Sequence, residues 1–168
     1  MPQLSEPVNL VNAQAIAKRR GIKIYEEKTS STEGFASLIK LRIVTQVPMQ
    51  QNQRKVSGIA VPRSVSGTLF GAEPRIVGID GYRVDFEPFG YMLIDSHVDK
   101  PGMIGQIGTI LGSHNINIAG MQLGRMFPSG SAVTVLSVDD PVSPEVLDKL
   151  RQVDGVENIR FVDLGGQQ

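Results

Sequence analysis

The sequence contains no cysteine, and its charges of the two signs cancel. Without cysteine, the chain has no disulfide, no thiolate metal site and no cysteine nucleophile. The 17 lysines and arginines against 17 aspartates and glutamates give no electrostatic reason to expect nucleic acid or an anionic membrane as a partner. No apolar run approaches membrane-spanning length, and the first residues lack the basic and apolar regions of a signal peptide. We therefore expect a cytoplasmic protein that binds neither nucleic acid nor membrane.

The motifs of common catalytic and cofactor sites are also missing. No GxGxxG follows an expected strand, no phosphate-binding P-loop is present, and the glycines of residues 102–108 have the wrong spacing for a dinucleotide site. Two histidines without cysteine give no convincing metal cluster. Asp95, Ser96 and His97 are neighbours along one expected strand, and this spacing alone does not make a catalytic triad. We therefore predict no catalytic residue, metal ion or cofactor in this chain.

The composition is that of a folded protein. It is 40% hydrophobic and 20% charged, which is typical of globular domains. A length of 168 residues suffices for one ordinary domain or for two small ones, each with a modest core.

The most informative stretch runs from residue 91 to residue 117. Its first part, Tyr91–Val98, has the length and apolar content of a strand. The sequence Asp-Lys-Pro-Gly at 99–102 ends that strand, because proline lacks an N–H and glycine permits a positive φ. Residues 103–114 then have the apolar period of a helix, and a second extended segment begins at Asn117.

This order predicts a small polar site where the first strand meets the helix. The helix N-terminus carries unpaired N–H groups and a partial positive charge, which suit an anionic group. His97 and Asp99 are two residues apart, so we expect their side chains on the same face, and Asp99 would accept a cationic group. An amino acid carries one group of each sign.

The remainder of the C-terminal half completes a repeating order of elements. Extended segments are expected at 117–126, 132–138 and 156–164, and a helix opens at Ser143-Pro144-Glu145 with a cap residue, a proline and an acid. The resulting order, βαββαβ, predicts a ferredoxin-like layer of helices on an antiparallel sheet.

The N-terminal half reads as an antiparallel α+β unit. A helix is expected at 8–20, where Gly21 would end it, and the turn pair Asp80-Gly81 predicts a type I′ hairpin between 75–79 and 82–86. Proline and glycine at 87–90 mark a boundary, so we predict an α+β domain at 1–88 and a ferredoxin-like domain at 89–168. Further strands are expected at 22–25, 35–47, 54–61 and 65–70.

The C-terminal half resembles an ACT domain, a small regulatory module that binds amino acids. The residues that carry this resemblance are Asp99-x-Pro101-Gly102, the helix that follows and Asn115-Ile116-Asn117-Ile118. The form from His97 to Gly102 is most similar to the serine-sensing module of the D-3-phosphoglycerate dehydrogenase family. The resemblance implies that L-serine contacts His97 and Asp99 of one subunit and Asn117 of the facing subunit.

Each of these three residues also has a simpler structural interpretation. Asp99 would cap the next turn, Asn117 would be a turn residue, and His97 would lie at the surface of a strand end. ACT domains of this family pair side by side, so the resemblance implies a homodimer or tetramer. We expect Tyr91–Val98 to be an exposed edge strand that such pairing protects.

The N-terminal half resembles the allosteric substrate-binding domain of the same family. The carrying segments are 11–13, 66–71 and 75–77. In the family this domain holds an anion with basic side chains, which makes Arg75 and Arg83 candidate anion-binding residues. Glu87 departs from the pattern, because some relatives have a basic residue there. The alternative is that both arginines lie on a solvated hairpin edge.

Together the resemblances imply a regulatory fragment of an NAD-dependent oxidoreductase of L-serine biosynthesis. L-Serine would act as an allosteric feedback inhibitor, and the NAD-binding catalytic region would be absent from this chain. Two alternatives are a β-type subunit of an iron–sulfur L-serine dehydratase, whose cluster would need cysteines of another chain, and a stand-alone amino-acid sensor.

Overall fold

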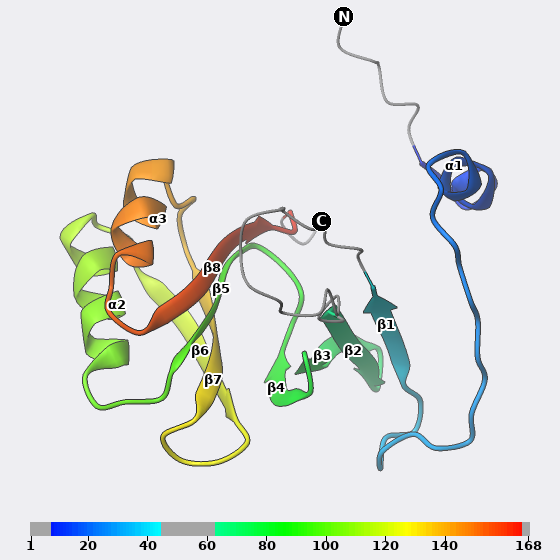
Figure 1. The fold of residues 1–168 in the computed structure, drawn as a ribbon, viewed down its shortest axis with the longest axis horizontal. Helices are drawn as coiled ribbons and strands as arrows, with labels where there is room; N and C mark the ends of the chain where they lie inside the picture. Colours follow the sequence, from blue (N-terminus) through cyan, green and yellow to red (C-terminus); the bar gives the residue numbers. More distant parts are fainter. Residues whose placement is uncertain (1–7, 45–62, 166–168) are drawn as a thin grey trace, which may run out of the picture. The chain divides into compact units, whose positions relative to one another are not determined.

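The computed structural model describes residues 8–44 and 63–165, which belong to two compact units, Met1–Thr32 and Glu33–Gln168 (Figure 1). The first unit contains the helix α1 (Ala13–Arg19). This helix begins five residues later than predicted, because the side chain of Asn9 accepts the N–H groups of Val11 and Asn12 and folds a local turn instead. Gly21, with φ of 70°, follows the end of the helix as predicted. The predicted strand at 22–25 is wrong, because the chain is irregular there.

The second unit begins with a four-stranded antiparallel sheet, which we call the hairpin sheet. Its strands lie in the order β1-β2-β3-β4. The turn between the last two strands has positive φ at Asp80 (51°) and Gly81 (86°), which confirms the predicted type I′ turn. The predicted strand at 35–47 is shorter in the structure, and the residues at 45–47 and 54–61 lie outside the described part of the chain. The strands are β1 (Ile39–Ile43), β2 (Arg63–Phe70), β3 (Glu73–Ile79) and β4 (Tyr82–Phe86).

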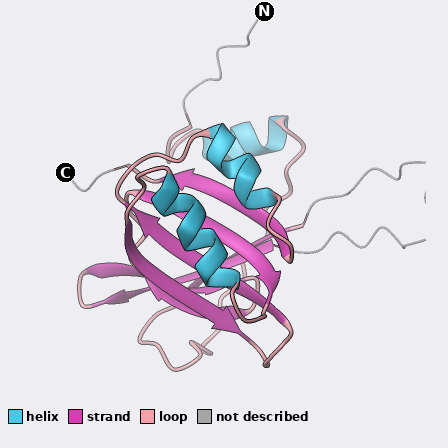
Figure 2. Cartoon of the chain, turned by 90° about the vertical axis from the view of Figure 1, so that its left-hand side faces the viewer, coloured by secondary structure: helices cyan, strands magenta, loops and turns pink. Residues whose placement is uncertain are grey.

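The rest of the second unit has the predicted βαββαβ order, and the α+β fold is confirmed. Its elements are β5 (Tyr91–Val98), α2 (Met103–Ser113), β6 (Ile118–Arg125), β7 (Ser131–Val138), α3 (Pro144–Arg151) and β8 (Val156–Asp163). Figure 2 shows α2 and α3 side by side across one face of this sheet. The strand order is β6-β7-β5-β8. The expectation that β5 is an edge strand is therefore wrong, because β7 and β8 pair with its two sides and leave β6 and β8 at the edges.

Local signals and burial together explain the two helices. Ser143 caps α3 by accepting the N–H of Val146 at 3.4 Å, and Pro144 occupies the first helical position. On each helix a stripe of apolar residues faces the sheet, and Leu111 and Leu150 are fully buried. Burying a leucine side chain contributes about 1.5–3 kcal/mol, so this core dominates the stability of the layer.

A second core joins the hairpin sheet to the other face of the β5–β8 sheet. Ile79, Val84 and Phe86 of the hairpin pack with Met92, Val133 and Val135. Gly124 on β6 allows this close approach, because a Cβ there would lie 2.7 Å from the carbonyl oxygen of Arg83. The chain divides into its two compact units after Thr32. The division of the sequence after residue 88 stays a prediction.

Candidate functional site

The end of β5 and the loop before α2 are held firmly between two turns. The N–H of Val98 donates to Gly155 O at 2.9 Å, and the N–H of Asp99 donates to Gly130 O at 2.7 Å. Gly102 then has a φ of 86°, a conformation that favours glycine, and the chain enters α2 directly after it. The backbone of the predicted amino-acid site is therefore fixed by hydrogen bonds to neighbouring turns.

The N-terminus of α2 has no compensating side chain. No side chain of residues 8–44 or 63–165 caps it, and its first turn contains no acidic residue. The first N–H groups of a helix lack intrahelical partners and carry the positive end of the helix dipole. An external anion near residues 102–105 would be stabilised by both effects.

Asp99 is largely buried and has a partner that sequence analysis missed. Its side chain is 19% exposed, and its Oδ2 lies 3.3 Å from Nη1 of Arg125, the last residue of β6. Arg125 is 26 residues away in sequence, and only the pairing of β6 with β7 brings it to this end of the sheet. The strand expected at 117–126 and the turn after it were the sequence features from which Arg125 could have been placed at this end of the sheet.

His97 lies inside the domain and not at its surface. It is 1% exposed, and its Nδ1 lies 2.6 Å from Oδ1 of Asp95, which is equally buried. The interpretation of His97 as a surface residue at a strand end is therefore wrong. Asp95 was missed as its partner, although the two-residue alternation of β5 places both side chains on the helix-covered face.

The buried pair is only partly satisfied. Asp95 Oδ2 and Thr134 Oγ1 are buried and have no hydrogen-bond partner in the described part of the chain, and their residues face each other across β5 and β7. Burial raises the pKa of Asp95, because it disfavours the charged carboxylate, and the hydrogen bond with His97 opposes that rise. His97 is therefore the main group that stabilises the ionised form of Asp95.

Asn117 lies at the opposite end of the sheet from Asp99. Its Nδ2 donates to Oδ2 of Asp139 at 2.6 Å, beyond the last residue of β7, whereas Asp99 contacts Gly130, before the first residue of β7. A strand of eight residues spans roughly 25 Å. Within one chain, the structure therefore does not bring Asn117 together with His97 and Asp99.

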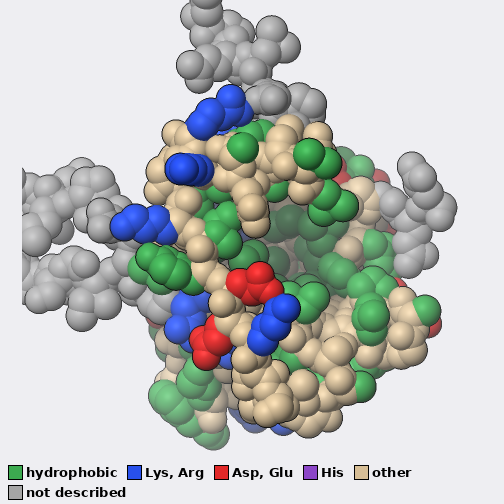
Figure 3. Space-filling model, turned by 90° about the vertical axis from the view of Figure 1, so that its right-hand side faces the viewer, with side chains coloured by type: hydrophobic (Ala, Val, Ile, Leu, Met, Phe, Trp, Pro, Cys, Tyr) green, Lys and Arg blue, Asp and Glu red, His purple; other side chains and the backbone are tan. Residues whose placement is uncertain are grey.

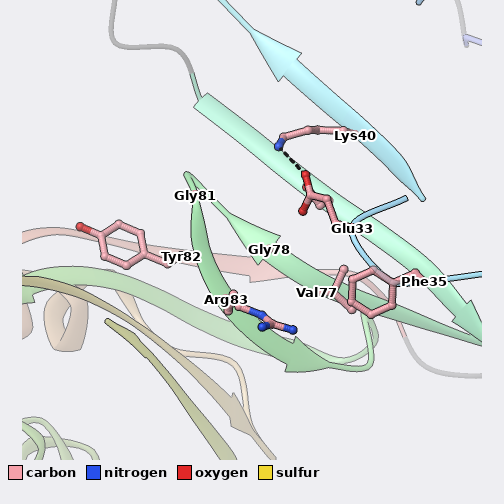
Figure 4. Close-up of a pocket in the computed structure, with 9 residues that line it drawn as sticks. Glu33, Phe35, Lys40, Val77, Gly78, Gly81, Tyr82 and Arg83 are labelled. Atoms are coloured by element: carbon pink, nitrogen blue, oxygen red, sulfur yellow. Dashed lines mark hydrogen bonds and ion pairs between the residues drawn. The ribbon is translucent and has the colours of Figure 1, made fainter. Parts of the chain in front are cut away.

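The two candidate anion-binding arginines have different surroundings. Arg75 lies 2.7 Å from Asp85, 3.2 Å from Glu87 and over the ring of Phe70. The hydrogen bond to Asp85 raises the pKa of Arg75, and two carboxylates already neutralise its charge. Arg83 instead lines a cavity of about 340 Å³ in the hairpin sheet, opposite the ion pair of Lys40 with Glu33 (Figure 4).

An apolar surface accompanies this cavity on the hairpin sheet. The side chains of Ile39, Leu41 and Ile43 on β1 are each more than half exposed. Figure 3, which views the molecule from the right-hand side of Figure 1, shows apolar side chains at the surface beside charged ones.

The described residues lack two further features. They contain no helix that is long and apolar enough to cross a membrane. They also contain no group of three or more histidine, aspartate or glutamate side chains placed to hold a metal ion.

Comparison with known proteins adds to this geometry. The family model of the ACT domain matches residues 91–155, and that of the D-3-phosphoglycerate dehydrogenase intervening domain matches residues 1–80. The D-3-phosphoglycerate dehydrogenase of Archaeoglobus fulgidus is 42% identical over 165 residues, which is 97% of this chain. Over nearly its whole length the chain is therefore similar to part of D-3-phosphoglycerate dehydrogenases, and its two halves match the intervening domain of that enzyme and the ACT domain.

Two further matches cover different parts of the chain. The D-3-phosphoglycerate dehydrogenase of Methanocaldococcus jannaschii is 35% identical over 163 residues. The chain spans 29% and 28% of the lengths of these two archaeal relatives. A solved structure, the ACT domain from GTP pyrophosphokinase of Chlorobium tepidum, is 25% identical, covers 44% of this chain and 97% of its own, and has a TM-score of 0.37.

Proposed function

We propose that this chain is the regulatory region of an NAD-dependent D-3-phosphoglycerate dehydrogenase and binds L-serine between two ACT domains. The observation that carries the proposal is the separation of Asp99 and Asn117 to opposite ends of the sheet, near the two ends of the edge strand β6. Two copies related by a two-fold axis would pair their β6 strands antiparallel. That pairing would place the partner's Asn117 beside Asp99 at each end of the interface.

The free edge of β6 supports this pairing. Among residues 8–44 and 63–165, β6 pairs only with β7, so its other side presents backbone groups that no described strand pairs with. Met121 and Leu123, in the middle of the strand, are 46% and 40% exposed. Pairing two such edges would join two four-stranded sheets and cover these apolar side chains.

The proposed ligand contacts follow from the chemistry of each group. Asp99 would accept the ammonium group of L-serine, and the N-terminus of α2 would face its carboxylate. The partner's Asn117 would bind the hydroxyl group, since a carboxamide both donates and accepts. His97 would support Asp99 from the buried side of the site, held in turn by Asp95.

Feedback inhibition would then be a coupling between two equilibria. A ligand that contacts both subunits stabilises one geometry of the pair, and that preference biases a catalytic region elsewhere in the enzyme. NAD would bind in that catalytic region. The curated relatives described above are dehydrogenases, which favours this proposal over a subunit of an iron–sulfur serine dehydratase.

A second proposal concerns the hairpin sheet. We propose that Arg83 binds an anion such as phosphate in the cavity that it lines, where the Lys40–Glu33 ion pair forms part of the opposite wall. The volume of about 340 Å³ and the position of Arg83 on its wall support this role. Arg75 would contribute indirectly, because Asp85 and Glu87 already occupy its guanidinium group.

Isothermal titration of the chain with L-serine, D-serine and glycine tests the first proposal. Asp99→Ala and Asn117→Ala should each abolish the L-serine signal. The matched controls Asp148→Ala and Asn158→Ala, on α3 and the opposite edge strand β8, should retain it.

Mixing the two inactive variants makes the test sharper. A mixed dimer keeps one site with an intact Asp99 and the partner's intact Asn117. Random mixing should therefore restore roughly one quarter of the wild-type sites. If mixing restores nothing although both variants dimerise, the site is not shared between subunits and the proposal is wrong.

A further inference from the structure

We infer that Arg125 binds the carboxylate of the effector, so that the Asp99–Arg125 pair recognises the zwitterion of an α-amino acid. This inference rests on the proposed ACT site and adds a residue to it. Arg125 is the last residue of β6 and pairs in register with Ala132 on β7, two positions from the Gly130 carbonyl that holds Asp99. Both side chains therefore lie at the same end of the sheet.

The contact between Arg125 and Asp99 leaves most N–H donors of the Arg125 guanidinium available for a ligand. A single distance of 3.3 Å joins Nη1 of Arg125 to Oδ2 of Asp99, and within the described residues the guanidinium has no other hydrogen-bond partner. The Arg125 side chain is 54% exposed. A guanidinium has five N–H donors in a planar fork that matches a carboxylate, so Arg125 retains the geometry for a two-point contact. Arg75, by contrast, is occupied by two carboxylates.

The charges of the pair are complementary to those of an amino acid. The ammonium group would lie against Asp99 and the carboxylate against Arg125, so each protein charge would gain a partner of opposite sign. A simple amine would leave the remaining N–H donors of Arg125 without an acceptor, and a simple acid would bring no donor to the carboxylate of Asp99. The pair therefore selects molecules that carry both groups.

The position of Arg125 also places a ligand that it binds at the interface of the proposed dimer. It lies at the C-terminal end of the free edge strand β6. In an antiparallel pairing of two β6 strands, that end lies beside the beginning of the other β6. A ligand held by Arg125 and Asp99 would therefore reach the partner's Asn117.

The test compares L-serine with L-serinamide, which lacks the carboxylate, and N-acetyl-L-serine, which lacks the ammonium group. The wild-type chain should bind both analogues at least about tenfold more weakly than L-serine, the equivalent of one charge-assisted hydrogen bond. Arg125→Gln should lower L-serine affinity to the level of L-serinamide and remove the preference between them. Arg125→Lys, which keeps the charge for Asp99 but loses the fork, should retain part of the preference.

Arg151→Gln is the matched control. Arg151 is 52% exposed and likewise forms one ion pair, with Asp148. This variant should keep the wild-type preference for L-serine. If Arg125→Gln also keeps it, the inference is overturned while the serine site stands.

A panel of α-amino acids separates the two proposals. If another α-amino acid binds in place of L-serine with the same dependence on Arg125, the effector is different but the zwitterion site is supported. If L-serine binds and Arg125 has no influence, only the Arg125 inference fails. If no α-amino acid binds to the folded dimer, both are wrong.

Discussion

Replacing His97 by leucine tests how the ACT domain tolerates its buried polar pair. In the native domain, Asp95 has one hydrogen-bond partner among the described residues, Nδ1 of His97 at 2.6 Å, and its second oxygen has none. His97→Leu would therefore leave a carboxyl group enclosed without any partner. Leucine has a similar volume, so the change is chiefly the loss of the hydrogen bond and of charge compensation.

The loss of unfolding free energy expected for His97→Leu is set by the free energy needed to protonate Asp95. An unpaired buried carboxylate is so unfavourable that the group takes up a proton instead. For a carboxyl with an ordinary pKa near 3.9 in the unfolded chain, protonation costs about 4 kcal/mol at pH 7 and about 1.5 kcal/mol at pH 5. We expect His97→Leu to lower the free energy of unfolding by about 3–4 kcal/mol at pH 7 and by about 1–1.5 kcal/mol at pH 5.

The sign of this pH dependence follows from linkage. Burial raises the pKa of Asp95 in the folded state. A group with a raised folded-state pKa contributes stability that is present below its unfolded pKa and is lost as pH rises through the folded value. Removing His97 raises the pKa of Asp95 further, so the variant should lose stability over a wider pH range above about pH 4 than the wild type.

Urea unfolding followed by far-UV circular dichroism, at pH 5 and pH 7 and at one protein concentration, measures these differences. The control is the double variant Asp95→Leu/His97→Leu, which removes both polar groups. It should recover most of the stability that the single variant loses, and the pH dependence of that loss should disappear. The reasoning is refuted if the single variant loses less than about 1 kcal/mol at pH 7, or if the double variant is less stable than the single one.

Two other predictions concern the hairpin sheet. Gly124→Ala should lower the free energy of unfolding by about 1–3 kcal/mol, because the new Cβ would lie 2.7 Å from Arg83 O. Gly120→Ala on the same strand, where the nearest atom would be 3.8 Å away, should be tolerated in the same denaturation experiment, and equal losses would contradict the packing argument. Arg83→Gln should weaken the binding of inorganic phosphate in a calorimetric titration, whereas Arg160→Gln should not; equal binding by both variants would exclude Arg83 from an anion site.

Sequence alone determined the elements whose signals are local. The Asp80-Gly81 turn, the Ser143-Pro144 start of α3 and the strand–loop–helix order around Gly102 all appear as predicted. In each case a few adjacent residues set the backbone conformation, through a positive φ, a cap or a fixed proline. The late start of α1 shows the limit of this approach, since the apolar period did not reveal that Asn9 would capture the first N–H groups.

Tertiary structure decided which of these elements are neighbours. No local signal states that β5 lies between β7 and β8, so its edge position was predicted wrongly. The pairing of the strands places Arg125 beside Asp99, which is 26 residues away in the sequence. It also places Asn117 at the opposite end of the sheet. Polar residues with the chemistry to bind an amino acid could thus be identified from the sequence. Strand pairing, which depends on contacts between distant segments, decided which of them meet within one chain and which lie at opposite ends of the sheet.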